Sequence, residues 1–261
     1  MPAERHLTSA FPNTVRFDKL KITWKFEYRY NAKDKWRSAG TETTEHETYI
    51  TYDRSYEEFK PRKRPWTQVL RRACSYAHGA DTLIKASSMV ATGIYDSLEF
   101  YYFGDQTHSI YDSRLNHWGI ALWLMLHEGW MDCRDSSNYW TIMMQWLGIT
   151  NAKYRKITEA QGAFYYKTLR PISTSRDINE GWSVRDPEDG GSNFWRFHQV
   201  GVIIHDPDNP DDSHVYDPII KINRNDPRVP VNMIKEDYQR DFYDNEGTFK
   251  WGSMGLVTYV F

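Results

Sequence analysis

One cysteine in this chain lies where a helix is expected to begin. Cys133 directly precedes a segment in which Trp140, Met143 and Leu147 recur at helical spacing. The N–H groups and the dipole at a helix N-terminus stabilise negative charge, so Cys133 is expected to hold more of its population as thiolate. Thiolate is the form of cysteine that attacks a carbonyl carbon. The alternative is a small buried residue without chemistry, because unpaired cysteine is among the most buried residue types.

A histidine and an aspartate follow at a spacing that can complete a catalytic site. Residues 197–204 are expected to form a strand that carries His198, and residues 214–222 a second strand that carries Asp217, with a turn-rich connection between them. In such a hairpin the carboxylate can orient the imidazole. Pro218 fixes the backbone just after the carboxylate. Cysteine, histidine and aspartate then supply a nucleophile, a general base and an orienting group.

These three residues and their neighbours resemble the transglutaminase-like branch of the papain-like superfamily. The similarity rests on Cys133 in GWMDCRDSSNYW, His198 in FHQVGVII and Asp217 in VYDP, and it spans roughly residues 115–222. It implies an α+β fold in which a helix bearing the cysteine packs on an antiparallel sheet bearing the histidine and the aspartate. It also implies a thioester acyl-enzyme, a peptide or protein substrate and no cofactor. The sequence departs from the family in the charged residues Asp132 and Arg134, because small residues commonly flank the cysteine.

Residues around the cysteine bear on its activation. Asp132 opposes formation of the thiolate and Arg134 favours it. The side chains that can cap the helix are expected to be Asp135, Ser136 and Ser137.

An oxyanion hole needs two hydrogen-bond donors. The backbone N–H of Cys133 is one natural donor, and the sequence does not assign the second. Trp118 is a candidate because of its upstream position and its indole N–H.

The remaining elements suggest a β-rich segment at residues 1–60 and a catalytic domain at residues 61–261. Alternation within residues 15–52 predicts two antiparallel strands that pack against the catalytic domain. Helices are expected over residues 66–78, 82–95 and 115–128, with Asp81 as N-cap of the second and Cys74 as a buried structural thiol in the first. Strands are expected within residues 153–170 and 248–261, the last returning to the sheet.

Composition limits the classes of partner. The chain has 261 residues and a formal net charge of −2, which gives no global electrostatic reason to bind nucleic acid or an acidic membrane. Residues 1–15 contain no apolar signal region, and no stretch approaches the roughly 20 apolar residues needed to cross a bilayer. A cytoplasmic location is therefore expected. Two cysteines far apart in sequence do not form a disulfide framework.

Three functions remain open on the sequence alone. The first is a cysteine hydrolase or acyltransferase acting on amide bonds, with hydrolysis favoured over cross-linking because no amine-binding site can be identified. The second is an inactive transglutaminase-like module that binds peptide or carbohydrate through the aromatic residues, which make up 16% of the chain. The third is a metal-dependent hydrolase using His198, His205 and His214, although no recognised metal-binding motif is present.

Overall fold

The computed structural model describes residues 14–52, 67–97, 100–102, 129–158, 164–165, 170–172, 194–195, 198–221, 228–242 and 250–255. These residues form an α+β fold, as predicted. The helices in them are α1 (Thr67–Tyr76), α2 (Leu83–Asp96), α4 (Cys133–Trp146) and α5 (Lys235–Phe242). None of these helices is long and apolar enough to cross a membrane.

The main sheet has five strands, and each neighbouring pair is antiparallel. Its strands, in spatial order, are β12 (Met233–Ile234), β10 (Asn209–Tyr216), β9 (His198–Asp206), β5 (Ala152–Thr158) and β13 (Lys250–Gly255). The first seven residues of β9 are buried, which suits a strand with a neighbour on each side. The prediction that the last segment returns to the sheet is confirmed by β13.

The predicted hairpin is confirmed, but the bounds predicted for its second strand are wrong. β10 begins at Asn209, so only Pro207 and Asp208 form the turn. The register of β10 shifts between Asn209 and Ser213, a segment that includes Pro210. Proline is tolerated at such an irregularity because it has no N–H to donate to the neighbouring strand. The strand ends before Asp217 because the N–H of Asp217 donates to Pro230 O (2.8 Å) instead.

Helix α4 lies against β9 on one side and against α1 and α2 on the other. Its Trp140 stacks on Tyr216 of β10, with ring centroids 5.0 Å apart, and donates its indole N–H to Ser87 O of α2 (3.1 Å). The indole lies over Gly201 of β9, where an added Cβ would lie 2.2 Å from a ring carbon. The absence of a side chain at Gly201 therefore lets α4 approach the sheet closely.

The N-cap of α4 is Asp132, so the caps predicted at Ser136 and Ser137 are wrong, whereas Asp135 takes part in the cap from the third helical position. The Asp132 carboxylate accepts the N–H groups of Arg134 (2.7 Å) and Asp135 (2.9 Å). The Asp135 carboxylate in turn accepts the N–H of Asp132 (3.2 Å), which completes a capping box. The helix begins at Cys133, three residues earlier than an N-cap at Asp135 would require.

Helices α1 and α2 confirm the predicted segments, with one wrong cap. The N-cap of α2 is Thr82, whose hydroxyl accepts the N–H of Lys85 (3.2 Å). Asp81, the predicted cap, forms an exposed ion pair with Lys85 (3.5 Å) instead. A cap must directly precede the first helical residue, and here that residue is Leu83.

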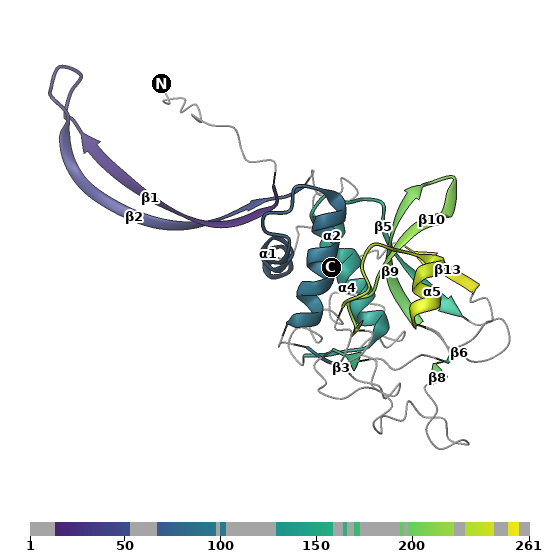
Figure 1. The fold of residues 1–261 in the computed structure, drawn as a ribbon. Helices are drawn as coiled ribbons and strands as arrows, with labels where there is room; N and C mark the ends of the chain where they lie inside the picture. Colours follow the sequence, from purple (N-terminus) through teal and green to yellow (C-terminus); the bar gives the residue numbers. More distant parts are fainter. Residues whose placement is uncertain are drawn as a thin grey trace, which may run out of the picture.

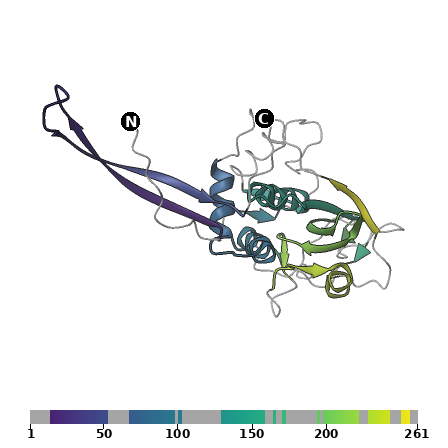
Figure 2. The ribbon, with the colours of Figure 1, turned by 90° about the horizontal axis from the view of Figure 1, so that it is seen from above.

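The two predicted N-terminal strands are confirmed as β1 (Arg16–Tyr28) and β2 (Arg37–Ile50). They form a long ribbon that projects away from the helices and the sheet (Figures 1 and 2). Among the described residues, contact with the body is confined to the base of the ribbon, where Val15 pairs with the backbone of Gly79 and Ala80, and Arg71 binds Glu47 (2.8 Å). The prediction that this strand pair packs against the catalytic domain is therefore wrong beyond the base.

Short strand pairs complete the described structure: β3 (Tyr101–Tyr102) with β4 (Trp130–Met131), β6 (Phe164–Tyr165) with β8 (Phe194–Trp195), and β7 (Arg170–Pro171) with β11 (Ile220–Lys221). The helix predicted at residues 115–128 and the domain boundary predicted at residue 60 lie outside the described residues. Both stay predictions.

Candidate functional site

The hairpin of β9 and β10 brings His198 and Asp217 together. The start of β9 and the end of β10 meet at the same edge because the two strands are antiparallel. His198 Nε2 lies 2.7 Å from Asp217 Oδ2, and both side chains are fully buried. An ionised carboxylate only accepts hydrogen bonds, so Nε2 is the donor. The neutral ring then carries its lone pair on Nδ1, the nitrogen that can take up a proton.

Three donors hold the Asp217 carboxylate. Besides His198, the Tyr238 hydroxyl donates to Oδ2 (2.6 Å) and the Ile219 N–H donates to Oδ1 (3.2 Å). Burial of a carboxylate without hydrogen bonds is costly, and these donors offset that cost. They also fix the direction in which the carboxylate presents Oδ2 to the imidazole.

Tyr238 is a site residue that the sequence did not reveal. It lies on α5, is fully buried and stacks on Phe242, with ring centroids 4.8 Å apart. The chain contains 18 tyrosines, and no motif distinguishes this one. Only the packing of α5 beside β10 brings its hydroxyl to Asp217.

Gln199 connects the cysteine helix with the strand that carries the histidine. Its side-chain amide donates to Ser137 Oγ and Asn138 Oδ1 of α4, each at 2.9 Å. Its backbone N–H hydrogen-bonds the thiol of Cys133, the first residue of α4. The thiol therefore lies beside the peptide unit that joins His198 to Gln199. No sequence pattern distinguishes this glutamine from the others in the chain.

The surroundings of Cys133 oppose ionisation of its thiol. Cys133 is only 8% exposed, and burial raises the pKa of its thiol well above the ordinary value. The negative charge of Asp132 raises this pKa further, whereas the Gln199 N–H and the charge of Arg134 lower it. The prediction of a thiolate-rich cysteine is therefore wrong. Burial is the main cause of the difference. The Asp132 cap adds to it, because its carboxylate takes the N–H groups and adds negative charge where a thiolate would need stabilisation.

The second carboxyl of the capping box is also perturbed. Burial raises the pKa of Asp135 well above its ordinary value, and the neighbouring charge of Asp132 raises it further. Two adjacent carboxylates repel each other, and retention of a proton by Asp135 relieves that repulsion. It also limits the negative charge beside the thiol.

One predicted oxyanion donor can be placed. The Asp132 cap uses the N–H groups of Arg134 and Asp135 but not that of Cys133, so the predicted role of the Cys133 N–H is compatible with the cap. Trp118 lies outside the described residues, and its role stays a prediction.

The second cysteine provides an internal comparison. Cys74 of α1 is fully buried, as predicted, and burial raises the pKa of its thiol to about 12. Its Sγ faces the carbonyl oxygen of Ile50 at 4.0 Å. Cys74 therefore shares the burial of Cys133 but lies in α1, at the base of the ribbon.

The three histidines of the metal hypothesis have separate surroundings. His198 is bound to Asp217, while His205 and His214 make an edge contact with ring centroids 4.3 Å apart. His214 Nδ1 pairs with Asn232 Oδ1 (2.7 Å). Within the described residues, no group of three His, Cys, Asp or Glu side chains is arranged to hold a metal ion.

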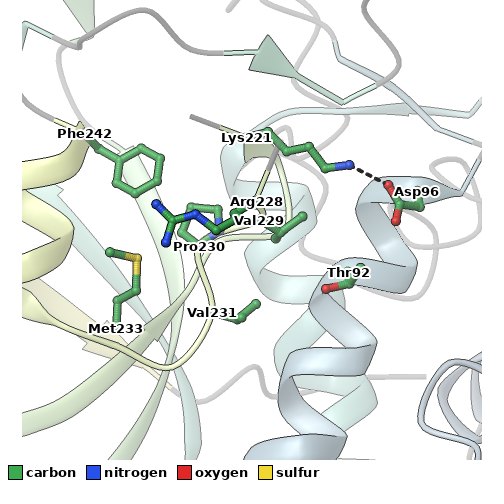
Figure 3. A pocket seen from close by; sticks show the side chains of 9 residues that line it. All are labelled: Thr92, Asp96, Lys221, Arg228, Val229, Pro230, Val231, Met233 and Phe242. Atoms are coloured by element: carbon green, nitrogen blue, oxygen red, sulfur yellow. Dashed lines mark hydrogen bonds and ion pairs between the residues drawn. The ribbon is translucent and has the colours of Figure 1, made fainter. Parts of the chain in front are cut away.

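A cavity of about 430 Å³ lies beside the segment that supports Asp217 (Figure 3). Pro230 and Phe242 are part of its wall, and Pro230 is the residue whose carbonyl accepts the Asp217 N–H. Lys221 and Asp96 line it as an ion pair (2.8 Å). Cys133, His198 and Asp217 are not among the described residues that line this cavity, which therefore adjoins the segment that supports Asp217.

Comparison of the chain with protein-family models, with curated proteins and with solved structures found no match.

Proposed function

We propose that this protein is a cysteine-dependent amide hydrolase or acyltransferase with a transglutaminase-like, papain-like core. Cys133 is the nucleophile, His198 the general base and Asp217 the orienting group. The observation that carries the proposal is the buried His198–Asp217 pair. The Cys133 thiol lies beside this pair, because it is hydrogen-bonded to the backbone N–H of the next residue, Gln199. A buried carboxylate is costly unless its oxygens have partners, and Tyr238 and Ile219 supply partners for Asp217.

The reaction divides into acylation and deacylation. In acylation, Sγ of Cys133 forms a bond to the substrate carbonyl carbon while the thiol proton passes to Nδ1 of His198. The tetrahedral intermediate then loses its amine as the C–N bond breaks, and His198 returns the proton to the leaving nitrogen. In deacylation, water gives a proton to His198 and attacks the thioester carbon. The C–S bond breaks and Cys133 regains its proton.

The raised pKa of Cys133 affects the timing of proton transfer. A neutral thiol is a weak nucleophile, so attack needs removal of the proton as the S–C bond forms. His198 is the group that performs this removal, with Asp217 stabilising the imidazolium that results. The site then resembles a serine hydrolase in its timing more than a preformed thiolate–imidazolium pair.

The expected substrate is an amide in a peptide or protein, and the expected acceptor is water. Water is the simplest acceptor for an acyl-enzyme. A transglutaminase would additionally need a site that admits an amine and excludes water, and no feature of the described residues identifies one.

Mass spectrometry of a pool of glutamine-containing peptides, incubated with and without a primary amine, tests both the activity and the acceptor. Backbone cleavage indicates a peptidase, and a gain of about one dalton at glutamine indicates a deamidase. An amine adduct that outpaces both products would replace hydrolysis by transfer. Cys133→Ala is expected to abolish every product, His198→Ala to be almost as severe and Asp217→Ala to leave more residual activity.

Cys74→Ala is the matched control because Cys74 is the other buried thiol of the chain. This variant is expected to retain turnover, since Cys74 lies in another helix. Full activity of Cys133→Ala would remove the proposal.

The burial and raised thiol pKa of Cys133 favour one competing function, an inactive relative that binds peptide or carbohydrate. An activated ester distinguishes the two. An enzyme gives a burst of alcohol release and an acyl adduct that maps to Cys133 and is lost in His198→Ala. Peptide or glycan binding without an adduct in the unmodified protein supports the binding module.

A further inference from the structure

We propose that the β1–β2 ribbon binds a second copy of this chain, with the apolar faces of two ribbons packed together in antiparallel orientation. This apolar face carries Leu20, Ile22, Trp24 and Phe26, which occupy alternate positions of β1. Alternate residues of a strand point to one side, so these four side chains form a continuous stripe. The proposal concerns a surface remote from Cys133 and does not depend on the proposed enzymatic activity.

The side chains of the stripe are about half exposed, and a two-stranded sheet has no second layer to bury them. Leu20 is 47% exposed, Trp24 46% and Phe26 49%. β1 and β2 pair only with each other among the described strands, and the body covers only the base of the ribbon (Figures 1 and 2). An isolated two-stranded ribbon is marginally stable in water and needs a further layer over its apolar face.

The apolar face carries paired polar groups and one carboxylate, Glu42, which lies opposite Trp24 in the register. Thr44 and His46 share this face because they lie opposite Ile22 and Leu20 in the register. The Trp24 indole N–H donates to Thr44 Oγ1 (2.8 Å), and His46 Nε2 pairs with the same hydroxyl (2.7 Å). Covering the Trp24 indole N–H and the Thr44 hydroxyl would break no hydrogen bond to water that the ribbon does not replace. The Glu42 carboxylate has to stay hydrated at the edge of the interface, because burial of a charge without a partner is costly. The face is therefore suited to an apolar partner.

The opposite face of the ribbon is suited to water. It carries Lys19, Lys21 and Lys25 on β1, and Lys19 forms an exposed ion pair with Glu45 of β2 (3.3 Å). Covering these charges would cost desolvation energy, and exposed ion pairs contribute too little stability to offset that cost. The two faces thus differ in the manner expected of a ribbon that buries one face only.

The chain itself offers a matching surface. Most of the large apolar side chains that are exposed in the described residues belong to the ribbon and its turn: Leu20, Trp24, Phe26, Tyr28, Tyr30 and Trp36. The others, Tyr52, Ile84 and Ile234, come from separate elements. The ribbon of a second copy is therefore the apolar surface of this chain that matches the stripe in length. Pairing a surface with itself gives a closed two-fold dimer, the commonest symmetric assembly.

The charge at the turn selects the antiparallel orientation. Residues 29–37 contain four cations, Arg29, Lys33, Lys35 and Arg37, and a single carboxylate, Asp34. A parallel arrangement would bring the two basic turns together, and like charges at short range repel. An antiparallel arrangement places the turns at opposite ends, with a body attached to each base.

The size of the face predicts a weak dimer. A 13-residue strand is about 43 Å long, and the ribbon face offers on the order of 500 Å² per copy. About 1,000 Å² in total lies at the low end of specific interfaces, so we expect a dissociation constant in the micromolar range.

Sedimentation equilibrium over a range of micromolar concentrations tests the dimer. The average mass is expected to rise from 31.0 kDa toward twice that value. A double variant, Trp24→Lys with Phe26→Lys, is expected to stay monomeric, whereas Lys21→Ser with Lys25→Ser on the opposite face should dimerise as the wild type does. Circular dichroism and the thermal midpoint check that the body is folded in each variant. A wild-type chain that stays monomeric to several hundred micromolar, or a double variant that dimerises equally well, overturns the proposal.

A spin label at the turn tests the orientation. Ala32→Cys places the label there, and both native cysteines are buried. Antiparallel packing centred near Trp24 puts the two labels about 50 Å apart. A distance below about 20 Å would mean parallel packing and would overturn the antiparallel arrangement.

Discussion

At the residue scale, the candidate site is governed by charges that act on one thiol in opposite directions. Asp132 raises the pKa of Cys133 and Arg134 lowers it, although the two side chains bind each other (3.2 Å). Burial adds to the effect of Asp132, so the neutral thiol prevails. The same carboxylate that starts helix α4 thus opposes ionisation of the thiol that the helix carries.

Asp132→Asn is expected to lower the pKa of Cys133. Asparagine is as good an N-cap as aspartate, so the helix start is retained while the charge is lost. The pH midpoint for alkylation of Cys133 by iodoacetamide should fall by about one pH unit, as followed by peptide mass spectrometry. Arg134→Gln is the opposing control and should move the midpoint upward. Movement of both variants in one direction would contradict this balance of charges.

Tyr238→Phe is expected to reduce kcat about tenfold, the equivalent of 1.4 kcal/mol of barrier. Loss of the hydroxyl removes one donor from Asp217 Oδ2 but keeps the ring that stacks on Phe242. Asp217 should then stabilise protonated His198 more strongly, which moves the acidic limb of the pH–rate profile to higher pH. Phe242→Leu, which alters the stack and keeps the hydroxyl, should leave that limb in place. If both variants behave alike, Tyr238 has only a packing role.

The pairing of His198 with Asp217 was predictable from the sequence, whereas their supporting residues were not. Strand alternation and a nearby turn place both residues on one hairpin, so local pattern suffices. Tyr238 reaches the same carboxylate from a helix 21 residues further along, a contact that no local pattern encodes. The raised pKa of Cys133 was missed for a related reason, because burial depends on the whole fold.

At the element scale, the approach of α4 to the sheet depends on one missing side chain. Trp140 occupies the space above Gly201 and touches both β10 and α2 from there. This contact lies two turns along the helix from Cys133. The height of the helix above the sheet therefore sets where the thiol lies relative to Gln199.

Gly201→Ala is expected to destabilise the protein and to reduce activity. A Cβ would lie 2.2 Å from Trp140, so the helix or the strand must shift, at a cost of about 1–3 kcal/mol. Gly93→Ala is the matched control, since its Cβ would lie 2.6 Å from Tyr76 in the contact between α1 and α2. Thermal unfolding should show a loss in both variants, and turnover corrected for folded protein should fall only in Gly201→Ala. Equal turnover in the two variants would show that helix height does not control the site.

The sequence predicted which helices and strands exist better than it predicted the residues at which they begin and end. Hydrophobic pattern identified the hairpin, the cysteine helix and the two N-terminal strands. The wrong ends have specific causes: Thr82 outcompetes Asp81 by adjoining the first helical residue, and β10 stops where the Asp217 N–H finds Pro230. Both depend on backbone partners that sequence composition does not specify.

At the scale of the whole molecule, a body with a buried core carries a ribbon that is fixed only at its base. Sequence pattern predicted the ribbon strands but not their projection, because alternation reveals an apolar face without revealing what covers it. The core, in contrast, contains two buried thiols whose protonation is tied to folding. The free energy of unfolding of the whole protein should therefore decrease at alkaline pH.

The free energy of unfolding is expected to fall as pH rises above about 9. Burial raises the pKa of Cys74 from 9.0 to about 12, and that of Cys133 also rises. The unfolded chain releases these protons first, so the stabilisation present below pH 9 is lost as pH increases, by about 1.4 kcal/mol per pH unit for each thiol. Urea titrations between pH 7 and about pH 10.5 measure the slope, and Cys74→Ala should make it shallower. An unchanged slope in that variant would contradict the assignment.

The near-complete burial of Cys133 also affects its oxidative chemistry. Peroxide attacks thiolate far faster than thiol, and exposure governs which cysteines reach the sulfenic and then the irreversible sulfinic state. A buried, protonated Cys133 is therefore expected to resist this damage. Under the proposed mechanism it is vulnerable only while a bound substrate draws its proton onto His198. Under the proposed function, the burial that keeps Cys133 protonated would thereby lengthen the time for which the protein stays active under oxidising conditions.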